Sequence, residues 1–94
     1  MKNELIFLNG VYLNKHILDE GDMVTKHTHT FNHISIVAKG AVVVHMNGGE
    51  MLATAGDTVE IAANTPHRIE ALTEATWICV HSDDPTPEAP HDGV

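Results

Sequence analysis

Short strand-like runs separated by tight-turn residues constrain the fold of this chain more than any other feature of its sequence. Asn9-Gly10 is a strong hairpin signal, and no stretch of ten or more residues shows helical periodicity. Short strands at near-regular spacing are typical of an all-β barrel or sandwich. The expected strands are Leu5–Leu8, Val11–Leu18, Met23–His29, His33–Ala38, Ala41–Met46, Glu50–Thr54, Thr58–Ala62, His67–Leu72 and Ala75–Ser82.

Ninety-four residues predict one domain, which we place over residues 1–82. Residues 83–94 carry three of the four prolines and four acidic side chains, with almost nothing to bury. We therefore expect an acidic, proline-rich tail that is disordered or loosely draped. A chain this short buries only about 60% of its unfolded surface, so metal binding or oligomerisation would add needed stability.

The formal net charge of −8 at pH 7 disfavours nucleic acid and anionic membranes as partners. The single cysteine, Cys79, excludes an internal disulfide, and we expect it to be a small buried hydrophobe on the last strand. The apolar run Leu5–Leu8 is too short for a signal peptide or a membrane span. We expect a soluble protein in a reducing, cytoplasmic setting.

Three of the eight histidines, His27, His29 and His33, lie within seven residues. Successive side chains of a strand point to opposite faces, so His27 and His29 share one face. On a straight strand His33 would lie about 20 Å from His27, because each residue advances about 3.3 Å. The chain must therefore reverse over residues 30–32, which we predict places His33 on the neighbouring antiparallel strand, facing the same interior.

A fourth histidine, His67, follows the turn-like segment 62–66. Neutral imidazole is a favoured ligand of first-row transition metals. We predict that His27, His29, His33 and His67 surround one divalent ion, with scattered exposed histidines as the alternative. Iron, manganese, nickel, copper and zinc all accept imidazole, so the spacing leaves the metal open. No nucleophile signature or phosphate-binding loop is present, so no catalytic residue and no organic cofactor is assigned.

Two strands are apolar on both faces, within Ile34–Ala38 and Ala41–Val44. A half-exposed strand would alternate between apolar and polar residues. Apolarity on both faces predicts that one face lines the interior while the other meets a second sheet or another subunit. We therefore expect a homodimer.

The residues around the histidines resemble the first motif of the cupins, G-x5-H-x-H-x3-4-E-x6-G. Gly21, His27, His29, His33 and Gly40 fit it at every spacing. The one departure is His33, which stands where the family usually has glutamate. The resemblance implies a jelly-roll barrel, also called a double-stranded β-helix, with a metal inside one end.

The second cupin motif, G-x5-P-x-G-x2-H-x3-N, is matched in spacing from Gly56 through His67 to Ala71. Its proline, glycine and asparagine have become Ala62, Asn64 and Ala71. Asn64 is a sensible replacement for glycine, because asparagine tolerates the left-handed conformation better than most residues. Together the two motifs cover residues 21–71, and the strand pattern extends the likeness over about residues 5–82.

The histidine at position 33 changes the charge of the expected site. A carboxylate would cancel one of the metal's two positive charges, whereas four neutral imidazoles leave a full +2 that favours anionic ligands. His33 either binds the metal or acts as a base behind three other ligands. Sequence spacing leaves both options open.

The family implies no single reaction, so two classes of function stay open. The first is a small metal-dependent enzyme, dioxygenase-like or an isomerase or lyase, acting on a small enolisable, phenolic or carboxylate compound. The second is a non-catalytic module that binds a small molecule or sugar beside a structural or anchoring metal.

Overall fold

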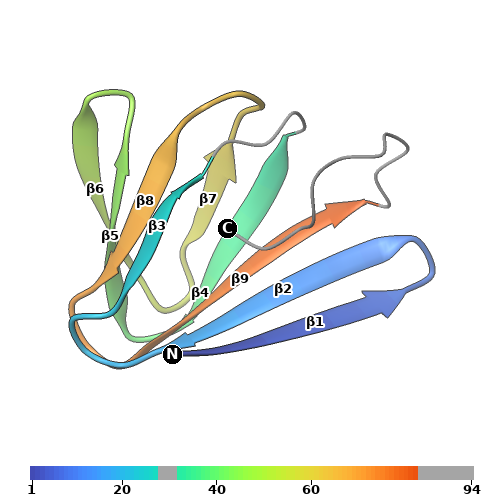
Figure 1. Cartoon of the computed structure of the whole chain (residues 1–94), viewed down its shortest axis with the longest axis horizontal. Helices are drawn as coiled ribbons and strands as arrows, with labels where there is room; N and C mark the ends of the chain where they lie inside the picture. The colour runs from blue at the N-terminus through green and yellow to red at the C-terminus, as the bar shows by residue number, and fades with distance from the viewer. Residues whose placement is uncertain (28–31, 83–94) are drawn as a thin grey trace.

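The computed structural model describes residues 1–27 and 32–82, with the backbone alone for residues 25–27. Within these ranges the chain forms β-strands and no helix (Figure 1), which confirms the all-β prediction. None of the described residues forms a helix able to span a membrane. The strands are β1 (Lys2–Leu8), β2 (Val11–Leu18), β3 (Met23–His27), β4 (His33–Lys39), β5 (Ala41–Met46), β6 (Gly49–Thr54), β7 (Thr58–Ile61), β8 (His67–Ala71) and β9 (Ala75–Ser82).

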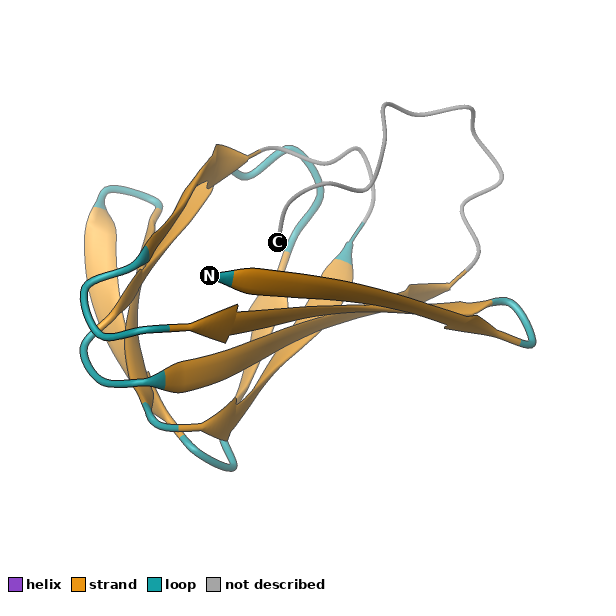
Figure 2. Cartoon of the chain, turned by 60° about the horizontal axis from the view of Figure 1, so that its bottom comes forward, coloured by secondary structure: helices purple, strands orange, loops and turns teal. Residues whose placement is uncertain are grey.

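The strands form two antiparallel sheets that face each other (Figure 2). One sheet has the order β1-β2-β9-β4-β7 and the other β3-β8-β5-β6. Side chains alternate along each strand, so one face of each sheet supplies the core. In β9, Ala75, Trp77, Cys79 and His81 are buried while the residues between them are half-buried.

Cys79 lies in this core and is 2% exposed, as the sequence predicted. Ser35 Oγ donates a hydrogen bond to Cys79 Sγ at 3.4 Å. Burial disfavours the thiolate and raises the pKa of the Cys79 thiol to about 12. The thiol is therefore protonated at neutral pH and packs as a small apolar group.

Three glycines of the motifs make turns at one end of the barrel, which we call the turn end. Gly21, Gly40 and Gly56 have φ of +86°, +76° and +96°, a region that L side chains rarely adopt. Backbone hydrogen bonds tie the turns together: Gly21 N–H donates to Ala71 O at 2.9 Å, and Gly56 N–H donates to Val37 O at 2.8 Å. The motif spacing therefore closes this end, and His33 and His67, the first residues of β4 and β8, lie at the other.

One predicted strand pairing is wrong. His33 was expected on the strand next to that of His27, but β3 lies in the four-stranded sheet and pairs with β8. β4 lies in the five-stranded sheet, between β9 and β7. The chain reverses direction between two strands whether they form a hairpin in one sheet or lie in two facing sheets. His33 is 5% exposed and faces the interior, as expected, but it does so from the opposite sheet.

Candidate metal centre

His33 and His67 meet inside the barrel from opposite sheets. Each is the first residue of its strand, His33 of β4 and His67 of β8. The two side chains are 5% and 1% exposed, and their ring centres lie 5.7 Å apart with the planes tilted by 52°. Two of the four predicted ligands are thus brought together at the end away from the motif glycines.

The loop before β8 sets the orientation of His67. Asn64 has a φ of +61°, so asparagine supplies the left-handed turn that the sequence predicted at this position. His67 Nδ1 donates a hydrogen bond to the Thr65 carbonyl oxygen at 2.8 Å, because a carbonyl can only accept. In the neutral ring this leaves Nε2 as the atom with the lone pair, which is the state a metal-binding imidazole needs.

A second contact fixes the same loop to the start of β4. The Ala63 backbone N–H donates to Asn32 Oδ1 at 2.7 Å, and Asn32 directly precedes His33. The segments that present His33 and His67 are therefore joined outside the barrel core. This hydrogen bond holds the loop before His67 against the residue that precedes His33.

The arrangement of these two rings fits one metal ion. Imidazoles bound at about 2.1 Å have ring centres about 3.2 Å from the ion, and hence roughly 4.5–6.4 Å from each other. The observed 5.7 Å lies within that range. The donors are imidazoles in a buried setting, which suits a first-row transition metal.

The other two predicted ligands are only partly within the described structure. The backbone of His27 pairs with that of His67 across β3 and β8. His29 lies outside the described residues. Among the side chains that are described, no group of three or more His, Cys, Asp or Glu residues could hold a metal ion. The four-histidine site therefore stays a prediction.

The walls around the two histidines are apolar. Ile61 pairs with His33 across β7 and β4 and is 2% exposed. In β8, Ile69 and Ala71 share the buried face with His67, while Arg68 is exposed and Glu70 half-buried. This alternation keeps both charged side chains out of the interior.

Two cavities reach the pair. One of about 600 Å³ approaches His67 between the β5–β6 turn and Pro66. The other, of about 730 Å³, is lined by His33, His81, Asn32 and Glu60 together with apolar residues of β2, β4, β7 and β9. A small molecule therefore has room beside either histidine.

His81 lines the larger cavity together with His33, and it was not singled out from the sequence. It is 9% exposed, its Nδ1 donates to the Ser82 carbonyl oxygen at 2.8 Å, and its ring stacks on Tyr12 with centres 5.1 Å apart. Phe7 extends this row, 4.6 Å from Tyr12. The parity of β9 could have revealed His81, because it shares a face with the buried Trp77.

His45 borders the smaller cavity beside His67, but it does not line the larger one beside His33. It sits on the outer face of β5, where its Nε2 is 3.2 Å from Glu70 Oε1 and its Nδ1 is 3.9 Å from Glu50 Oε2. Because its ring nitrogens face Glu50 and Glu70, it is a control for metal binding by the buried histidines.

The Cupin domain family matches residues 14–81, so the chain belongs to the cupins. No curated protein matches it. Among solved structures, KdgF from Halomonas sp. has a TM-score of 0.78 at 22% identity, covering 87% of this chain and 77% of that one. A cupin superfamily protein from Desulfitobacterium hafniense reaches 0.81 at 12% identity, covering 88% and 77%.

A variant of salicylate 1,2-dioxygenase from Pseudoaminobacter salicylatoxidans, in complex with gentisate, is also similar. Its TM-score is 0.72 at 23% identity, covering 79% of this chain but 20% of that one. Likenesses at these identities establish the fold alone, and they confirm the predicted jelly roll.

Proposed function

We propose that this cupin binds one divalent transition metal through His27, His29, His33 and His67 and uses it to hold a small anionic molecule. The observation that carries the proposal is the approach of His33 and His67, 5.7 Å apart and buried, from opposite sheets. The hydrogen bond from His67 Nδ1 to Thr65 O supports it by directing Nε2 toward metal binding. The motif spacing supports the remaining two ligands.

When bound, the metal would supply Lewis-acid chemistry and, for a redox-active ion, dioxygen chemistry. The chain's own groups define what it would act on. Ile61 and Ile69 exclude water from the walls, which strengthens electrostatic attraction for an anionic oxygen. His81, protonated at Nδ1, would offer Nε2 as a hydrogen-bond acceptor beside His33.

The favoured function is a dioxygenase-like reaction on a small enolisable, phenolic or carboxylate compound. The likeness to a dioxygenase in complex with gentisate makes phenolic carboxylates the first compounds to test. We expect iron- or manganese-loaded protein to consume dioxygen with at least one compound of such a panel. Uptake should be lost in His67→Ala and kept in Leu52→Lys, a change at an exposed position that lines neither cavity, as measured with an oxygen electrode. Absence of uptake with every compound and both metals would count against an enzyme of this type.

Binding without chemistry is the second candidate, and the lining of the larger cavity favours it. Acid–base catalysis needs proton-transferring groups. Among the described residues that line this cavity, Glu60 carries the single carboxylate, and the other titratable groups are His33 and His81. This shortage of acid–base groups favours binding. A carboxylate or sugar that raises the melting temperature of the metal-loaded protein and is recovered unchanged would establish this function.

We also propose that the protein works as a homodimer. The chain is short and devotes buried positions to His16, His33, His67 and His81 instead of apolar side chains. A partner that covers exposed apolar surface would offset this loss.

A further inference from the structure

The outer face of the five-stranded sheet, turned away from the four-stranded sheet, carries an apolar patch that crosses four strands. Four of its members are well exposed, Leu8 by 68% and Ile34 by 48% among them. One register row crosses β1, β2, β9 and β4 through Ile6, Leu13, Val80 and Ile34. We call the following eight residues the outer patch: Ile6, Leu8, Val11, Leu13, Ile34, Ile36, Ile78 and Val80.

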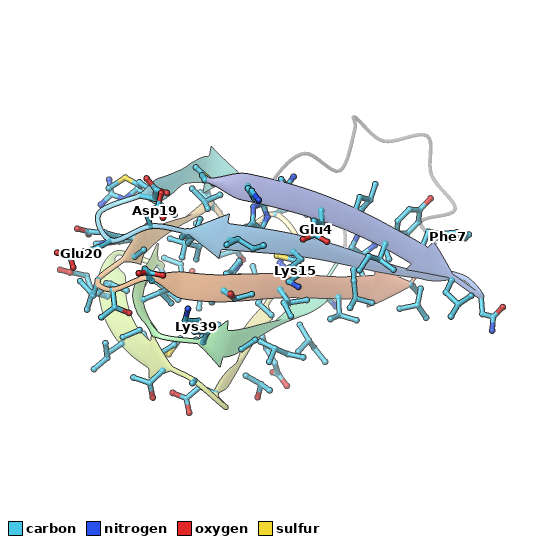
Figure 3. The ribbon with its side chains drawn as sticks, turned by 90° about the horizontal axis from the view of Figure 1, so that it is seen from below. Glu4, Phe7, Lys15, Asp19, Glu20 and Lys39 are labelled. Atoms are coloured by element: carbon cyan, nitrogen blue, oxygen red, sulfur yellow. The ribbon has the colours of Figure 1, made fainter. Side chains whose placement is uncertain are left out.

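The charges around the outer patch nearly cancel, unlike those of the whole molecule. Three lysines and two glutamates lie on its strands, and Lys39 Nζ is 3.6 Å from Glu74 Oε1 of the β8–β9 turn, whereas the chain carries −8. Three of the chain's five basic residues are therefore on one face. Glu4 and Lys15 stand directly opposite each other in the β1–β2 pair (Figure 3). The charged residues of this face are Lys2, Glu4, Lys15, Lys39 and Glu60.

The outer face of the four-stranded sheet has a different character. Few apolar side chains lie on it, and Leu52 among them is 62% exposed. The polar and charged residues of this face include His45, Glu50, Arg68 and Glu70. A charged face of this kind is ordinarily solvated. The exposed apolar surface of the two sheets is thus concentrated on the five-stranded one.

The outer patch also borders the cavity beside His33. That cavity is lined from the interior by His33, His81 and Ile61, and from the outer patch by apolar side chains of three strands. The three patch residues are Val11, Ile34 and Val80. Whatever covers the patch therefore lies next to the candidate site.

We propose that a second copy of this chain covers the outer patch, related by a twofold axis, so that the two five-stranded sheets pack face to face. The five strands hold 34 residues in all, and at a rise of about 3.3 Å per residue and a strand spacing of about 4.8 Å they give a face of roughly 500 Å². Two such faces bury about 1,000 Å², the lower bound for a specific interface. A near-neutral face lets two chains of −8 approach, and a twofold axis makes the interface the same patch on both copies.

This inference rests on the homodimer proposed above and is independent of the metal. The test is light scattering coupled to size-exclusion chromatography over a dilution series, with Ile34→Lys and Ile6→Lys. Both positions are about half exposed, so a lysine is tolerated in the folded chain, and at position 34 it faces Glu60. Wild type should be a dimer. Because each substitution occurs twice in a symmetric interface, we expect the dimer dissociation constant to rise about 100-fold or more.

Leu52→Lys is the matched control on the outer face of the other sheet, and it should leave the dissociation constant within about threefold. Fluorescence of Trp77, the single tryptophan and fully buried, verifies that each variant is folded. A dimer that Leu52→Lys dissociates and the two patch variants do not would overturn this interface while leaving the homodimer. A monomeric wild type would overturn both, without bearing on metal binding.

Discussion

Replacing Gly40 with alanine is expected to destabilise the protein by about 2–5 kcal/mol, a large share of the stability of a small domain. Gly40 has a φ of +76°, and an added Cβ would overlap the Glu74 carbonyl oxygen and lie 2.6 Å from Thr73 Oγ1. The left-handed backbone costs alanine about 1–2 kcal/mol, and the overlap adds about 1–3 kcal/mol because backbone must move. Urea unfolding followed by Trp77 fluorescence measures the loss.

Gly21→Ala is the matched control. Gly21 also has a positive φ, +86°, but an added Cβ would meet nothing within 4 Å. We expect a cost of about 1 kcal/mol from the backbone alone. Equal losses for the two variants would show that the close approach of the β8–β9 turn to Gly40 is unimportant, contrary to this structure.

Metal binding is expected to raise the melting temperature of the chelator-treated protein by about 15 °C or more when Zn²⁺ is present at 1,000 times its dissociation constant. An ion that binds only the folded state contributes about 4 kcal/mol under that condition. In a domain of this size each kcal/mol corresponds to about 4–8 °C. Differential scanning fluorimetry with Zn²⁺, which avoids redox side reactions, measures the shift.

Two histidine variants make this result specific. His67→Ala removes a buried ring whose Nδ1 is already bound to Thr65 O, and it should abolish the shift. His45→Ala removes a ring on the outer face, paired with Glu70, and should keep it. A shift that persists in His67→Ala would place the metal elsewhere on the molecule.

Local sequence rules predicted most of the architecture. Turn residues gave the bounds of β2 and β5 to the residue, because glycine and asparagine there adopt the positive φ that a tight turn needs. Cys79 is buried, as expected of a small hydrophobe on the last strand. Asn64 was correctly predicted to supply a left-handed turn.

The features that were not predicted from the sequence depend on pairing between strands that are distant along the chain. β1 begins at Lys2 instead of Leu5, since hydrogen bonding to β2 extends the strand through polar residues. The crossover between β3 and β4 could not be separated from a hairpin, as both reverse the chain. His81 went unassigned because its nearness to His33 depends on β9 lying beside β4, a pairing of residues more than forty positions apart.

The most direct test of the metal site is elemental analysis of untagged protein purified without chelator, beside His27→Ala, His33→Ala and His67→Ala. The proposed site predicts close to one equivalent of metal in the wild type and its loss in His27→Ala and His67→Ala. If His33→Ala also loses the metal, His33 is a ligand. If His33→Ala keeps the metal, the ligands are the other three histidines, and His33 is a base beside them. A wild type that contains no metal and takes up none on reconstitution would contradict the metal centre itself.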